Sequence, residues 1–152
     1  GFLTGTIAGL ATVTPAVGYI SPLFACVIGV LASIVCYGAV QFKNRIGLDD
    51  ALDVWPVHGV GGMMGMIWLG LFADKEWNPV SVWENGLLLG GSGKFFGVQV
   101  LSIVISSIWS FSATIAIFWI VDRITKVRVP ASMEAEGLDW GLHEELAETA
   151  DH

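Results

Sequence analysis

The sequence predicts an all-α membrane protein, a polytopic bundle of transmembrane helices, from its composition, its apolar blocks and its charge distribution. Of the 152 residues, 54% are hydrophobic and only 14% are charged, whereas soluble domains carry about 25% charged residues. The apolar residues gather in four blocks, at 2–19, 22–42, 54–73 and 96–121. The net charge of −7 does not describe the apolar body, because half of the 14 acidic residues follow Pro130.

Each block approaches or exceeds the roughly 20 residues that cross a hydrocarbon core as a helix. Backbone polar groups need internal partners in lipid, so helices are expected rather than strands. We therefore predict four spans, near 2–19, 22–42, 54–73 and 96–127. They form one transmembrane domain, 1–129, and an acidic tail follows at 130–152. The chain begins inside an apolar run without an initiator Met, so we expect upstream sequence to be missing.

The connecting segments support these boundaries. A tight turn at 18–22 joins the first two spans, and Pro22 suits the first turn of a helix because its missing N–H needs no partner there. The loop at 41–52 carries basic residues, whereas the loop at 74–93 is long and Gly-rich. Its Trp77 is typical of the aromatic belt at a membrane surface.

The basic residues predict the orientation. With four spans, the loop at 41–52 and the tail share one side of the membrane. That side holds Lys43, Arg45, Arg123, Lys126 and Arg128, and the other side holds Lys75 and Lys94. Because the basic side of a membrane protein faces the cytoplasm, we expect a multi-pass protein of the cell membrane with a cytoplasmic C-terminal tail.

His58 is the strongest candidate for a functional residue. It lies four residues into the third apolar block, and ionisable groups at membrane depth usually face a bundle interior or a pathway. The alternative is a neutral histidine that is hydrogen-bonded across helices.

Asp49, Asp50 and Asp53 precede the same block. Carboxylates favour a helix N-terminus, where the unpaired N–H groups and the helix dipole are positive. Helix capping is therefore our first interpretation of these residues, and a mechanistic role for Asp53 is the alternative.

The sequence gives little support for a metal site, a cofactor site or an enzyme active site. No group of His, Cys, Asp or Glu has metal-ligand spacing, and neither a cofactor nor a nucleic-acid partner is predicted. Cys26 and Cys36 would lie about 15 Å apart on a continuous helix, which is too far for a disulfide. The Gly-rich run at 59–62 lacks the Lys of a phosphate-binding loop. We therefore do not expect an enzyme.

Three motifs stand out in the sequence: TVTPAVGY at 12–19, DDALDV and VHGVGG within 49–62, and RVP and EGLD within 128–139. Together they resemble the ammonium transporter family, also called Amt/Mep/Rh. Residues 12–19 (TVTPAVGY) are similar to the family's ITPAAGYV stretch. Residues 49–62, which contain DDALDV and VHGVGG, are similar to its DDxxDVxxxHGVGG segment. Residues 128–139, with RVP and EGLD, are similar to its C-terminal LRVP…EGLD. The blocks stand in family order and near family spacing, so the resemblance covers essentially the whole chain.

The resemblance implies a fold of eleven transmembrane helices built from two inverted halves. This chain would supply helices eight to eleven and the cytoplasmic tail, and it would not conduct alone. His58 matches the second histidine of the family's twin-histidine pair, and Thr14 matches a threonine that faces the pore. Members are homotrimers with a hydrophobic pore for ammonium or ammonia through each subunit.

The resemblance also leaves one alternative function, a sensor of ammonium on the same scaffold. The tail reads LHEE at 142–145, where members typically show HGE followed by an aromatic residue. In bacterial members that tail helps to dock the PII signalling protein, which makes PII a candidate partner. The first pore histidine, the aromatic gate and the external recruitment site belong to the half of the fold outside this chain.

Overall fold

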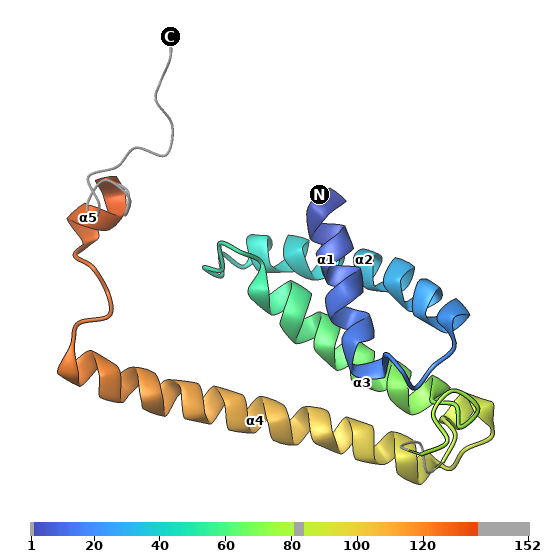
Figure 1. Ribbon diagram of the computed structural model, residues 1–152. Coiled ribbons are helices and arrows are strands. Elements are labelled where there is room, and N and C mark those ends of the chain that lie inside the picture. Colours follow the sequence, from blue (N-terminus) through green and yellow to red (C-terminus); the bar gives the residue numbers. More distant parts are fainter. Residues whose placement is uncertain (1, 81–83, 137–152) are drawn as a thin grey trace. The chain divides into compact units, whose positions relative to one another are not determined.

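The computed structural model describes residues 2–80 and 84–136, and within these ranges the chain is helical, without a strand. Figure 1 shows the succession of the helices. In chain order the elements are α1 (Phe2–Val13), the 3₁₀ turn η1 (Thr14–Ala16), α2 (Pro22–Arg45), the π-helical η2 (Trp55–Val60), α3 (Gly61–Phe72), the 3₁₀ turn η3 (Leu87–Leu89), α4 (Gly93–Ile124) and α5 (Ala131–Glu136). The prediction of an all-α chain is confirmed.

The chain divides into two compact units, Gly1–Ser107 and Ile108–His152. In the first unit α1, α2 and α3 pack against one another, and η1 and η2 take part in the same contacts. The largest fully buried side chains are Thr12, Ile28, Cys36 and Pro56. They come from α1, α2 and η2, so the core of this unit lies where these three elements meet.

The turn between α1 and α2 follows the sequence prediction. The Ser21 hydroxyl caps α2 by accepting a hydrogen bond from the Phe24 N–H (3.4 Å), and Pro22 occupies the first turn. The helix extends three residues beyond the predicted end. It is continuous between Cys26 and Cys36, and both cysteines are free.

The third predicted span is divided into two helix types. The backbone is π-helical from Trp55 to Val60 and α-helical from Gly61 onward. Pro56 lies at the start of the π-helical segment and has no backbone N–H, so it cannot donate a hydrogen bond of a regular α-helix. Helical backbone therefore occupies the predicted range, but it is not one uniform helix, and a membrane span at 54–73 stays a prediction.

The loop between α3 and α4 is tied to the ends of the helices. The Asp74 N–H donates to the Tyr19 carbonyl (2.8 Å), and the Gly86 N–H donates to the Ala73 carbonyl (2.7 Å). α4 then begins and ends three residues earlier than predicted.

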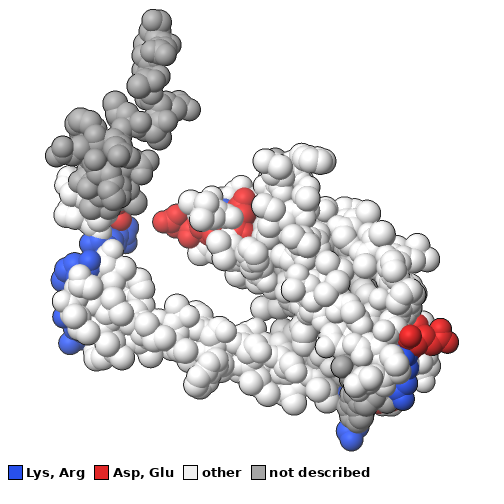
Figure 2. Space-filling model, viewed as in Figure 1, with Lys and Arg blue, Asp and Glu red and all other residues white. Residues whose placement is uncertain are grey.

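Two helices, α2 and α4, are long and apolar enough to cross a membrane, with mean hydropathies of 2.4 and 2.0. Only 17% and 0% of their most apolar windows are buried, unlike the core helices of a soluble protein. Figure 2 shows one face on which uncharged residues cover the helices and charged residues gather near helix ends and loops. The apolar stretch Phe2–Ala16 is shorter, so the count of four spans stays a prediction.

The second unit contains the basic end of α4 and the short helix α5. The Arg123 guanidinium lies 4.5 Å from the centroid of the Trp119 ring. Arg128 pairs with Glu134 through two hydrogen bonds of 2.8 and 3.1 Å, which connect the segment after α4 to α5. The expectation that PII is a partner rests on tail residues within 137–152, and these lie outside the ranges that the structure describes.

Candidate functional site

The π-helical segment η2 carries His58. Single π-helical turns are rare and occur frequently at functional sites. The His58 side chain is exposed and has no hydrogen-bond partner among the residues that the structure describes. The cross-helix hydrogen bond of the alternative interpretation is therefore not formed within 2–80 and 84–136. An unpaired imidazole keeps both ring nitrogens available to a ligand.

Thr14 begins η1, directly after α1. Its side chain is exposed, and its hydroxyl donates to the Leu10 carbonyl (2.7 Å). That bond uses the hydroxyl proton but leaves the oxygen free to accept a further hydrogen bond. η1 packs against α1 and α3, and η2 packs against the same two helices, so Thr14 and His58 lie on elements of one packed unit.

Two glycines allow this close packing. A Cβ on Gly65 would lie 2.1 Å from the Thr12 carbonyl oxygen, and a Cβ on Gly61 would lie 2.7 Å from the Thr12 hydroxyl. Small residues let helix backbones approach in this way inside membranes. The contacts fix the start of α3, and with it the end of η2, against the end of α1.

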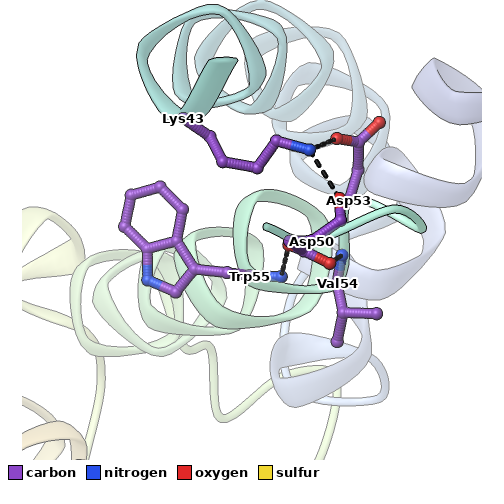
Figure 3. A network of polar contacts seen from close by, with 5 residues as sticks. All are labelled: Lys43, Asp50, Asp53, Val54 and Trp55. Carbon is purple, nitrogen blue, oxygen red and sulfur yellow. Dashed lines mark hydrogen bonds and ion pairs between the residues drawn. The ribbon is translucent and has the colours of Figure 1, made fainter. Parts of the chain in front are cut away.

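The acidic residues before η2 differ in their partners, and Figure 3 shows those of Asp50 and Asp53. Asp50 is the capping residue: its Oδ2 accepts from the Trp55 N–H (2.8 Å) and its Oδ1 from the Val54 N–H (2.9 Å). These hydrogen bonds, first that from Trp55, lower the pKa of the Asp50 carboxyl because they favour its ionised form. The exposed Asp49 side chain has no partner among the described residues.

Asp53 does not cap the helix with its side chain, contrary to our first interpretation. Its Oδ1 accepts a hydrogen bond from Lys43 Nζ at 2.6 Å. Its backbone has a φ of +54°, in the left-handed region where Asn and Asp are tolerated better than most residues. The Asp53 carbonyl accepts from the Val57 N–H (3.0 Å). Asp53 therefore connects the end of α2 to the first turn of η2.

Nothing in the sequence pattern marked Lys43 as part of this site. We counted it as a basic residue at the membrane surface, yet it is only 6% exposed. Its Nζ donates to Asp53 Oδ1 and to the Asp50 carbonyl, both at 2.6 Å (Figure 3). A lysine in the last turn of a helix usually interacts with the free carbonyls of that helix, so the acidic turn was not its expected partner.

Two cavities lie along the packing of α1 and α2. One, of about 580 Å³, is lined by small residues of both helices, including Gly5 and Gly29. The other, of about 590 Å³, reaches Asp53. Neither of these two cavities is lined by His58 or Thr14, the two predicted pore residues.

Comparison with known sequences gives one consistent family. The model described as Ammonium Transporter Family matches residues 1–148. Ammonium transporter Amt1 of Archaeoglobus fulgidus is 37% identical over 149 residues, which cover 98% of this chain and 37% of the relative. The ammonium transporter of Bacillus subtilis is 36% identical over 148 residues, which cover 97% of this chain and 36% of the relative. The chain thus spans about a third of the length of these relatives.

Solved structures agree on the fold. The crystal structure of Candida albicans Mep2 matches with a TM-score of 0.77 at 34% identity, over 87% of this chain and 30% of that one. A structure described as a sensor Amt protein matches with a TM-score of 0.74 at 27% identity, over 90% of this chain and 32% of that one. The chain therefore has part of the membrane helix bundle that these proteins share.

Proposed function

The chain belongs to the ammonium transporter family, and we propose that it is the C-terminal part of a protein that carries ammonium or ammonia across the cell membrane. The observation that carries the proposal is the family match over residues 1–148. It is supported by the two relatives above, both named as ammonium transporters. Family membership indicates a transporter rather than an enzyme.

Within the complete protein, we assign this chain to helices eight to eleven of an eleven-helix fold. The order of the blocks at 12–19, 49–62 and 128–139 supports this assignment. The pore would be completed by residues that this chain does not contain, which agrees with the exposure of His58 and Thr14.

His58 would line the hydrophobic pore as one of a twin-histidine pair. An ammonium ion loses its hydration in an apolar pore at a large free-energy cost, whereas neutral ammonia loses far less. An imidazole can accept a proton on one ring nitrogen and donate one from the other, so it suits proton passage. The unpaired His58 ring supports this role, and the free lone pairs of the Thr14 hydroxyl could accept an N–H of the substrate.

The proposal includes the assembly and its placement. We propose a homotrimer in the cell membrane, with lipid around the apolar α2 and α4 and with the tail in the cytoplasm. The basic residues at the end of the last span and just after it support this orientation; they are Arg123, Lys126 and Arg128. PII remains the candidate partner of the tail.

A second candidate function is a sensor of ammonium on the same scaffold. The match to the sensor Amt protein favours it. A sensor would bind ammonium without moving it in quantity, whereas a transporter would release it on the other side.

Uptake of labelled methylammonium into proteoliposomes that contain the complete protein tests the proposal. We expect saturable, protein-dependent uptake that ammonium inhibits by competition. Ammonium binding without uptake would favour the sensor. A protein that neither binds nor moves ammonium would contradict both functions.

A further inference from the structure

The last turn of α2 carries two basic residues with opposite environments. Lys43 is 6% exposed and bonded to the acidic turn, whereas Arg45 is exposed and has no partner among the described residues. A buried cation is retained only where it is paired and hydrogen-bonded, because its desolvation is costly. The Lys43 ammonium meets this condition through one carbonyl and one carboxylate.

Both hydrogen bonds of Lys43 end on residues that hold the start of η2. The Asp50 carbonyl accepts from Lys43, while the Asp50 carboxylate accepts from the Val54 and Trp55 N–H groups. The Asp53 carboxylate accepts from Lys43, while the Asp53 carbonyl accepts from the Val57 N–H. Lys43 therefore fixes the turn from which the π-helical segment begins (Figure 3).

We propose that Lys43 is a positioning residue for His58, acting through the Asp50–Asp53 turn. His58 follows Asp53 by five residues and lies inside η2. A π-helix contains more residues per turn than an α-helix. Each residue of an α-helix turns by about 100° around the helix axis. A change of η2 toward α-helical geometry would therefore rotate the His58 ring around that axis. The lysine thus sets the direction of a ring that it does not touch, and the consequence for transport rests on the function proposed above.

The test uses the complete transporter in detergent or nanodiscs, with Lys43→Met and the matched control Arg45→Met. Met keeps an apolar stem and removes the ammonium group. In Lys43→Met we expect the amides of 54, 55 and 57–60 to exchange with deuterium about tenfold faster or more, because a partly buried carboxylate loses its cation. Arg45→Met should exchange like the wild type. Lys43→Arg should restore protection, because a guanidinium can donate to both oxygens.

A second readout reports on the ring itself. The ¹⁵N resonances of His58, identified by their loss in His58→Gln, should shift in Lys43→Met and stay unchanged in Arg45→Met. Equal exchange and equal ring resonances in the Lys43→Met and Arg45→Met proteins would overturn the inference. If Lys43→Met does not insert, Asp53→Gly decides by the same two measurements, because Gly tolerates the left-handed backbone and removes the carboxylate that accepts from Lys43.

These readouts do not require transport. Suppose that the wild-type protein takes up no methylammonium, but Lys43→Met still alters the exchange and the ring resonances. This result would refute the proposed function and leave the positioning role intact. Unaltered exchange and resonances in a protein that does transport would refute the positioning role alone.

Discussion

Gly65 of α3 faces the backbone carbonyl of Thr12 so closely that a Cβ would lie 2.1 Å from the oxygen. Gly65→Ala therefore requires one of the two backbones to move, and overpacking of this kind costs about 1–3 kcal/mol. We expect a lower melting temperature of the complete protein in detergent, measured by intrinsic fluorescence.

Gly62 provides the matched control on the same helix, because a Cβ there would have no atom within 4 Å apart from its chain neighbours and the backbone of its own helix. Gly62→Ala should leave the melting temperature unchanged or raise it, since Ala favours a helix over Gly by about 1 kcal/mol. Equal melting of the two variants would show that α1 and α3 do not approach as described.

Asp53 combines an ion pair with a left-handed backbone, so Asp53→Ala and Asp53→Asn should differ. Asn keeps an oxygen acceptor for Lys43 and tolerates a φ of +54°. Ala keeps neither advantage, and a left-handed backbone costs an ordinary residue about 1–2 kcal/mol. We expect Asp53→Ala to lower the melting temperature more than Asp53→Asn does, with measurable transport in both. Equal melting temperatures combined with loss of transport in both would instead make Asp53 a mechanistic residue.

Because of Asp50, the folding stability of the protein should depend on pH in the acidic range. The folded-state pKa of Asp50 is lowered, chiefly by the Trp55 N–H. Its stabilising contribution is therefore present above the unfolded Asp pKa of about 3.9 and is lost as the pH falls through the lower folded value. We expect Asp50→Ala to melt below the wild type at pH 7, with the difference shrinking below about pH 4. Asp49→Ala is the control and should show no difference at either pH. An Asp50→Ala deficit that stays constant down to pH 3 would contradict the capping role.

The helix positions could be predicted because apolar blocks and their flanking turns carry strong local signals. Pro22 and Ser21 mark the start of α2, and its apolar run predicts a membrane-length helix. The π-helical geometry of η2 could not be predicted in this way. Pro56 is buried and η2 packs against α1 and α2, and these tertiary contacts cannot be read from the sequence of η2.

The sequence predicted the residues of the candidate site but not the hydrogen bonds between them. His58 was identifiable because an ionisable ring in an apolar block is unusual. The different roles of Asp50 and Asp53 depend on the left-handed backbone at 53 and on the burial of Lys43. The first is a backbone conformation that few Asp residues adopt, and the second is a tertiary feature. The usual exposure of lysine made Lys43 the least predictable of these residues.

Residues 1–152 expressed alone should not move methylammonium across a liposome membrane. His58 and Thr14 are exposed on this chain and face neither of the two cavities, so the proposed pore needs further helices around them. The measurement compares uptake by the isolated chain with uptake by the complete protein at equal reconstitution. Saturable uptake by the isolated chain would show that the pore lies elsewhere.

The central claim is that His58 lines the pathway of a transporter. The most direct test is His58→Ala in the complete protein, with methylammonium uptake and exclusion of potassium measured in the same proteoliposomes. Membrane insertion and oligomer size serve as the controls for folding. We expect correctly inserted protein whose uptake falls by about tenfold or more, or which admits potassium. Unchanged uptake together with unchanged exclusion of potassium would contradict the account and leave His58 as a packing residue.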